Sequence, residues 1–212
     1  MSFLILLIEN QSLINIMNIF FLDKNPQKCA EFMCSRHIVK MVLESAQLLC
    51  TTRHLLGDTT HISYRKTHEK HPCQIWLKSN PHHYYWTLAL GFALCNEYSY
   101  RYEKRHKTEK VMEECRNSFF SGNIPHFSSA TTSDLSFDDC ERVYNLCSIP
   151  ALAMPDEYKI EGDAIQSYRR YYALNKYFTI DFRYNKRQQP EWIGEIQREN
   201  QEIIRRYQTS DP

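Results

Sequence analysis

An amine and a carboxylate stand one helical turn apart in the stretch from His37 to Thr51. On a helical wheel of about 100° per residue, Lys40 and Glu44 share a polar arc of roughly 80° with His37, Gln47 and Thr51. Most other positions of the stretch are apolar, and a helix that is hydrophobic nearly all round is normally buried. An unpaired buried charge is expensive, so both charged groups must face each other, a partner helix or a cleft. The pair is therefore either an ion pair at the edge of the surface or the wall of an active site.

The elements that would position these groups are long helices. We predict one helix over residues 29–53 and a second over 82–110, in which an apolar first half gives way to Glu97 and Arg101. Both have long apolar arcs interrupted by charge, which predicts that the two helices pack together. The expected fold class is mostly α: a single compact helical domain built on two long packed helices, with a basic aromatic C-terminal segment.

The chain divides into a core and two ends. Residues 1–16 begin with an apolar run that lacks a basic region and a cleavage site, so they resemble neither a signal peptide nor a membrane helix. Met17 restarts the chain as a second possible translation start, and a short strand or extended entry follows it. We predict that 1–16 is a dispensable N-terminal extension, that 17–193 is the helical domain, and that 194–212 is a peripheral helix and tail.

Shorter elements are expected between and after the long helices. Residues 59–71 predict a basic, His-rich loop, and Pro72 fixes a turn before a new helical segment. Residues 117–150 are rich in Ser, Asn, Asp and Pro, which predicts a long loop or insertion with one short helix near 138–146. A third helix is expected over 163–177.

Charge is segregated along the chain, although the formal net charge is only +1. Residues 65–110 hold nine Lys and Arg against four Asp and Glu, residues 111–163 three against ten, and residues 164–190 six against one. If the two basic segments meet in space, they form a patch suited to a phosphate backbone. If they do not meet, they are ordinary solvated faces.

Composition excludes some classes of site. The chain has 5 glycines and neither a G-x-G-x-x-G nor a G-x-x-x-x-G-K motif, which argues against Rossmann and P-loop phosphate sites. The 8 cysteines are irregularly spaced and no C-x-x-C pair occurs among them, so we predict reduced thiols, an intracellular location and no bound metal. No cofactor is expected.

Several short motifs carry a family resemblance. The block N-P-x3-A-x6-H-x6-E runs from Asn25 through His37 to Glu44, and H-P-x3-W, E-Y-x2-R-Y and M-P-D-E-Y follow it. These motifs resemble a family of phage and large-virus proteins that is distantly similar to the pyrimidine-dimer DNA glycosylases of the phage endonuclease V family. The similarity spans residues 17–192, and its specific part is the interval from His37 to Glu44.

The resemblance implies a compact helical DNA-repair enzyme, a glycosylase and lyase that cleaves duplex DNA at pyrimidine dimers or abasic sites. An amine would attack the sugar carbon C1′ to give a Schiff base, with Glu44 as general acid/base. In that family the amine is the N-terminus exposed by removal of Met. Here Asn18 follows Met17, and a bulky Asn usually prevents that removal, so Lys40 is the second candidate. Leu43 stands where the family has a basic residue. A monomer in the cytoplasm or nucleus of an infected cell is expected.

The other predicted site residues would hold DNA. His37 is counted among the catalytic residues with Glu44 and Lys40. Together with His71 and Arg101 it would bind the phosphates that flank the lesion. Aromatic side chains would hold the opened base region. The predicted nucleic-acid-binding residues are His71, Arg101, Tyr102, Arg183, Lys186, Arg187 and Trp192.

Two alternatives to this enzyme stay open. One is a non-catalytic viral helical protein that binds nucleic acid with its two basic segments. The other is a metal-dependent nuclease that would use His68, His71, Cys73 and Glu44. No membrane partner is expected in any of these cases.

Overall fold

The computed structural model describes residues 17–127 and 140–208. All regular secondary structure within these residues is helical and no β-strand occurs there, which confirms the predicted mostly-α fold class. The predicted extension, residues 1–16, and the middle of the predicted insertion, residues 128–139, lie outside the described residues. Within the described ranges, no helix has the length and apolar character needed to cross a membrane.

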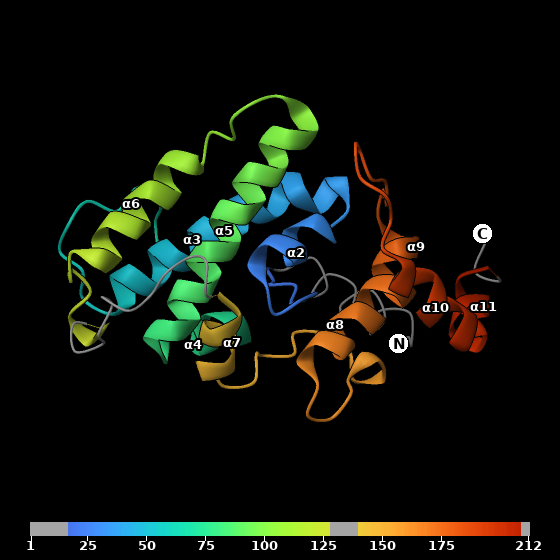
Figure 1. Ribbon diagram of the computed structural model, residues 1–212. Coiled ribbons are helices and arrows are strands. Elements are labelled where there is room, and N and C mark those ends of the chain that lie inside the picture. The colour runs from blue at the N-terminus through green and yellow to red at the C-terminus, as the bar shows by residue number, and fades with distance from the viewer. Residues whose placement is uncertain (1–16, 128–139, 209–212) are drawn as a thin grey trace, which may run out of the picture.

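Two long helices form the centre of the fold. Helix α3 spans Ser35–Leu55 and helix α5 spans Pro81–Tyr102. They pack against each other, as predicted (Figure 1). Gly91 of α5 lets the neighbouring helix α6 approach closely, because a Cβ at this position would stand 2.1 Å from Cε of Met112. The central pair is therefore supported by α6, which contacts both α3 and α5.

The remaining elements surround this pair, with the C-terminal helices gathered on one side (Figure 1). In chain order they are α2 (Pro26–Glu31), α4 (Pro72–Lys78), α6 (Glu109–Phe120), a turn at Pro125–Phe127, α7 (Cys140–Leu146), a turn at Asp156–Tyr158, α8 (Ala164–Tyr171), a π-helical turn at Tyr172–Lys176 (the π-turn), α9 (Tyr177–Thr179), α10 (Glu191–Glu199) and α11 (Gln201–Gln208).

Three helices begin with the same local signal. Asn25, His71 and Asn80 each accept a hydrogen bond from a backbone N–H of the first turn, and each is followed by a proline. Such a side chain satisfies a donor that the helix itself leaves free, and proline at the first position has no N–H to satisfy. The predicted role of Pro72 in opening a helical segment is thus confirmed.

The predicted helix boundaries were wrong at two places. The helix expected over 29–53 is split into α2 and α3, because Cys34 is extended and donates its backbone N–H to the hydroxyl of Tyr172 at 2.8 Å. The helix expected over 82–110 ends at Tyr102, since Glu103 takes a left-handed φ of 56° that closes the last turn.

The C-terminal half also differs in detail from the prediction. The helix expected over 163–177 begins after the N-cap Asp163 but widens into the π-turn before it ends. The tail expected as a single helix over 194–208 is two helices, which meet at Asn200. Helix α6 runs four residues into the range 117–150, which was expected to be a loop, whereas α7 matches the short helix predicted there.

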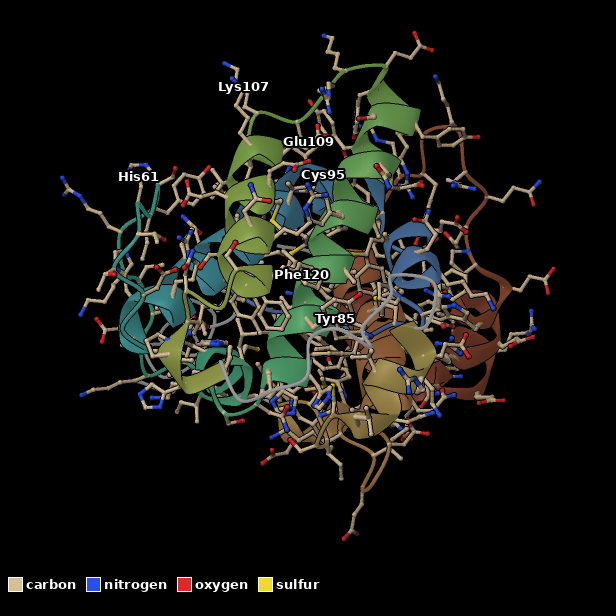
Figure 2. All side chains as sticks on the ribbon, turned by 60° about the vertical axis from the view of Figure 1, so that its left-hand side comes forward. His61, Tyr85, Cys95, Lys107, Glu109 and Phe120 are labelled. Atoms are coloured by element: carbon tan, nitrogen blue, oxygen red, sulfur yellow. The ribbon has the colours of Figure 1, made fainter. Side chains whose placement is uncertain are left out.

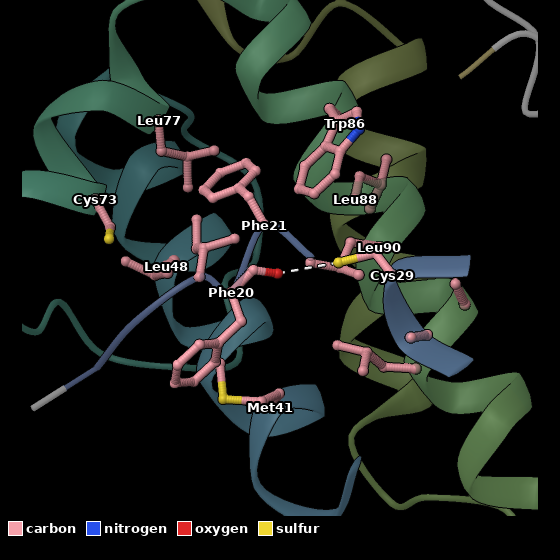
Figure 3. Packing of buried hydrophobic residues seen from close by; sticks show 14 of the residues in the cluster. Phe20, Phe21, Cys29, Met41, Leu48, Cys73, Leu77, Trp86, Leu88 and Leu90 are labelled. Atoms are coloured by element: carbon pink, nitrogen blue, oxygen red, sulfur yellow. Dashed lines mark hydrogen bonds between the residues drawn. The ribbon is translucent and has the colours of Figure 1, made fainter. Parts of the chain in front are cut away.

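An extended segment, residues 17–22, runs through the middle of the core, as the predicted extended entry requires. Figure 3 shows Phe21 against Trp86 of α5, and their ring centroids are 4.7 Å apart. The thiol of Cys29 donates to the carbonyl of Phe20 at 3.0 Å, which ties α2 to this segment. Because these side chains are almost fully buried, the segment is held in place by packing on all sides.

The layer between α5 and α6 is aromatic, and Phe120 lies at its exposed edge. Figure 2 shows Tyr85 and Phe120 between these helices, with ring centroids 6.1 Å apart. Cys95 is buried in the same layer, whereas Lys107 and His61 are exposed at the periphery (Figure 2). The cysteines that the structure describes are free thiols.

Candidate functional site

A cavity of about 560 Å3 opens beside the first turns of α3, between the extended N-terminal segment and the end of the π-turn. Its volume lies in the range of small-molecule sites. The three residues predicted as catalytic, His37, Lys40 and Glu44, all line it. The complete lining is Asn18, Phe20, Arg36, His37, Lys40, Glu44, Lys176, Thr179, Ile180 and Asp181.

Glu44 is held from two sides at this cavity. One carboxylate oxygen accepts a hydrogen bond from the backbone N–H of Asn18 at 3.1 Å, and the other lies 2.9 Å from Nζ of Lys40. Glu44 is 7% exposed, while the side chain of Lys40 is 46% exposed. The predicted ion pair and the predicted cavity wall are therefore the same feature, with Lys40 at the rim and the carboxylate inside.

Asn18 presents its backbone N–H to Glu44 because its own side chain is fixed. The side-chain oxygen accepts a hydrogen bond from the hydroxyl of Tyr168 at 3.0 Å, and the side-chain amide donates to the carbonyl of Ala153 at 3.0 Å. Both partners come from the C-terminal half of the chain. The geometry of Glu44 thus depends on contacts between distant parts of the sequence.

His37 is a neutral imidazole in the cavity wall. Burial, with the positive charges of Lys176 and Lys40, lowers the pKa of His37 to about 3. Its Nδ1 lies 2.9 Å from the hydroxyl of Tyr172, which accepts the backbone N–H of Cys34 and so keeps its own hydrogen for the imidazole. Its Nε2 has no hydrogen-bond partner among the described residues.

Lys176 is the cavity residue that sequence reasoning missed. It is the last residue of the π-turn, is 6% exposed, and has no hydrogen-bond or ion-pair partner in the described part of the chain. Its Nζ lies 4.9 Å from the ring centroid of Tyr171. Burial, together with the nearby charge of Lys40, lowers the pKa of Lys176 to about 8, although Glu44 opposes this shift. A substantial fraction of this amine is therefore neutral near physiological pH.

A second hollow continues the cavity along α3. It has a volume of about 560 Å3 and shares Arg36, Lys40 and Asp181 with the first. Two of the predicted nucleic-acid-binding residues line it. Tyr102 donates its hydroxyl to the carbonyl of Ser35 at 3.1 Å, and Arg183 forms an exposed ion pair of 2.5 Å with a neighbouring aspartate. The two hollows form a polar groove with basic side chains at its edges.

The two basic segments do meet, but around a carboxylate. Arg101 is 3% exposed and its Nε lies 2.6 Å from Glu97, and Arg187 reaches the same carboxylate at 2.8 Å. Lys186 is paired with Glu103. These side chains neutralise acidic groups within the fold. Their predicted role in binding phosphates stays a prediction, and none of them lines the cavity.

His71 and Trp192 also lie outside the cavity. His71 caps α4 by accepting the backbone N–H of Cys73 at 3.2 Å. The ring of Trp192 is 6.0 Å from that of Phe32 and stands under the guanidinium of Arg169 at 5.4 Å. Neither side chain lines the cavity, and their predicted contacts with DNA stay a prediction.

The residues of the alternative metal site do not converge. His68 and His71 line a separate hollow from Glu44, and burial raises the pKa of the Cys73 thiol to about 12, which disfavours a thiolate ligand. In the described residues no group of three His, Cys, Asp or Glu side chains is arranged to hold a metal ion.

The cavity thus joins a fixed carboxylate, a neutral imidazole whose Nε2 has no protein partner, and a buried amine with no counter-charge in contact, all within the described residues. Only the carboxylate, the imidazole and Lys40 were identifiable from spacing, because they share one helix. Compared with known proteins, the chain matches no family profile, no characterised protein and no solved structure.

Proposed function

We propose that this chain is a DNA-repair enzyme, a glycosylase with lyase activity that acts on pyrimidine-dimer or abasic sites in duplex DNA. The observation that carries this proposal is the cavity in which the carboxylate of Glu44 and an amine with a lowered pKa face the same space. An amine and a carboxylate are the two groups that Schiff-base chemistry at a sugar carbon requires.

Each polar group of the cavity has a role in this chemistry. The amine attacks C1′, and Glu44 moves protons at the sugar ring oxygen and at C2′. Nε2 of the neutral His37 forms a hydrogen bond with a sugar or phosphate oxygen without adding charge. Arg36 and Lys40, at the rim and along the adjoining hollow, bind the phosphates on either side of the reacting sugar.

The proposal is tested with duplexes that contain one abasic site or one pyrimidine dimer, in the presence of a chelator. We expect strand cleavage, and we expect borohydride to trap a covalent protein–DNA adduct by reducing the imine. Binding with neither cleavage nor an adduct would identify a nucleic-acid-binding protein without this chemistry. Cleavage that the chelator abolishes would identify a metal-dependent nuclease instead.

A further inference from the structure

Three nitrogen atoms stand close enough to the cavity to be considered as the attacking amine. The nitrogen of Asn18 is a peptide amide, which lacks a reactive lone pair in the continuous chain. Lys40 is half-exposed and is held as an ammonium against Glu44 at 2.9 Å. Lys176 is buried, lines the cavity and has no hydrogen-bond or ion-pair partner within the described ranges.

We infer that Nζ of Lys176 is the nucleophile that forms the covalent imine with C1′ of the substrate sugar, an inference that rests on the proposed function. Lysine acts as a nucleophile only when it is neutral, and enzymes achieve this by desolvation or by a neighbouring cation. Lys176 has both, since it is buried and the positive charge of Lys40 lies nearby.

The balance of charge around Lys176 favours the neutral amine. The titratable and charged groups that face it are Arg36, His37, Lys40 and Glu44 from α3, Tyr171 from α8 and Asp181 from the segment after α9. Burial is the largest influence on its pKa, Lys40 adds to it, and Glu44 opposes it, with a net value of about 8. The ring face of Tyr171, 4.9 Å from Nζ, also favours the ammonium, as a cation–π contact does. No carboxylate is in contact with Lys176 among the described residues to hold the proton on the amine.

The backbone explains why this lysine lies at the cavity. The π-turn inserts a wider turn between α8 and α9, and Lys176 is its last residue. Such turns are uncommon and are frequent at functional sites, because the extra residue shifts every following side chain around the helix axis. The same turn begins with Tyr172, whose hydroxyl fixes His37. One local distortion therefore positions two groups of the cavity.

The reaction at an abasic site balances with water alone. Neutral Lys176 adds its lone pair to C1′ of the open-chain aldehyde, the carbonyl oxygen leaves as water with the two amine protons, and an imine remains. A proton from solvent makes the imine an electron sink. Glu44 then removes a proton from C2′, and the C3′–O bond breaks with its electrons leaving on the phosphate. Hydrolysis of the imine restores the amine.

The experiment is borohydride trapping on a duplex with one abasic site, followed by tandem mass spectrometry of the adduct. In the wild-type protein we expect the reduced adduct on Lys176. The rate of trapping should rise with pH to a midpoint near 8, the value expected for this amine, rather than near that of an exposed lysine. Mapping the wild-type adduct needs no variant, so a folding defect cannot obscure the result.

Variants supply the second arm. Lys176→Met keeps the length of the side chain and should lower adduct formation by about 100-fold or more. Lys40→Met removes a phosphate contact and the positive charge beside Lys176, so it should slow trapping, but the adduct that forms should still map to Lys176. Lys24→Met is the matched control, because Lys24 also lies over a tyrosine ring, at 6.0 Å from that of Tyr144, but outside the cavity. Circular dichroism establishes that each variant is folded.

The outcomes separate this inference from the proposed function. An adduct on Lys40, or on an α-amine exposed by processing beside Glu44, would overturn the role of Lys176 and leave the lyase chemistry standing. Unchanged trapping by Lys176→Met would do the same. Failure of the wild-type protein to form an adduct on any of the duplexes would overturn both.

Discussion

The two ends of α3 hold buried charges in opposite ways. Near the C-terminal end, Arg53 is 1% exposed and its guanidinium donates to Asp58 at 2.6 Å, to Glu114 at 2.6 Å and to the carbonyl of His61 at 2.8 Å. Burial would raise the pKa of Asp58, but hydrogen bonds from Ser118, Thr60 and Arg53 lower it to about 2. This cluster is closed, because its cation and its carboxylates satisfy one another.

At the N-terminal end the buried groups are left partly unsatisfied beside an open cavity. Lys176 has no counter-charge in contact within the described residues, and Nε2 of His37 has no partner there. A buried ion network satisfies its own charges, whereas a buried cation without a partner is unfavourable for stability, and groups of this kind cluster at functional sites. The difference between the two ends identifies the site more directly than the number of charges does.

The largest expected effect is at the closed cluster. Arg53→Met should lower the free energy of unfolding by about 3–5 kcal/mol, because it leaves buried Asp58 without its cation. Urea denaturation at neutral pH measures this change. Arg105→Met is the control, since Arg105 forms two hydrogen bonds to Glu109 but its side chain is 83% exposed, and its loss should leave the stability nearly unchanged. An equal loss of unfolding free energy in both variants would contradict the stabilising role of the closed cluster.

At the open cluster the expected effect is on catalysis. Glu44→Gln keeps the shape of the side chain and should lower strand cleavage by about 100-fold, or about 2.7 kcal/mol, while binding of the duplex is retained. Glu114→Gln makes the same change at the closed cluster and serves as the control. We expect it to lower the free energy of unfolding, while the folded protein cleaves at the normal rate. A folded Glu44→Gln protein with full activity would remove Glu44 from the mechanism.

Removing the unsatisfied cation should stabilise the fold. Lys176→Met is expected to raise the free energy of unfolding by about 1–3 kcal/mol at pH 7, because the folded protein holds this charge unfavourably. The folded pKa of about 8 lies below the ordinary value of 10.5, so the unfolded state binds more protons between these values and wild-type stability rises with pH there. The difference in free energy of unfolding between Lys176→Met and wild type should therefore be largest below pH 8 and decrease towards pH 10.5. A variant less stable than wild type at pH 7 would contradict this sign.

The smallest expected effect concerns the groove beside the cavity. Arg36 is exposed, whereas Arg183 is already paired with Asp181 at 2.5 Å. Arg36→Ala should reduce the slope of log affinity against log salt by about 0.9, the loss of one phosphate contact. Arg183→Ala should change it less, because its partner already neutralises it. Fluorescence anisotropy with a labelled duplex at several salt concentrations gives both slopes.

The part of the fold that could be predicted from sequence is the part set by local pattern. The apolar arcs of α3 and α5 predicted both helices and their packing, and Pro72 after His71 marked the start of a helical segment. The break before α3 could not be predicted, because its cause is Tyr172, whose hydroxyl caps Cys34 from 138 residues away. Propensity describes neighbours in sequence and carries no record of such a partner.

The candidate site divides in the same way. His37, Lys40 and Glu44 fall on one face of one helix, so helical spacing alone could group them. Lys176 shares no periodicity with them, and the π-turn that presents it has no signal in the spacing of residues. Lys176 was counted among the basic residues of 164–190, which gave only the charge of that segment. The pKa of its amine depends on burial in the folded protein, which the sequence does not show.

The extended segment at residues 17–22 makes the assembly of the cavity a late event in the synthesis of the chain. Asn18 is anchored by Tyr168, 150 residues later, and the amine of Lys176 follows still later in the chain. Contacts of such long sequence separation form late, so a ribosome-bound chain holds Glu44 without the hydrogen bonds that position Asn18 and without Lys176 beside it. Only a chain that has been completed as far as the π-turn brings the two halves of the site together.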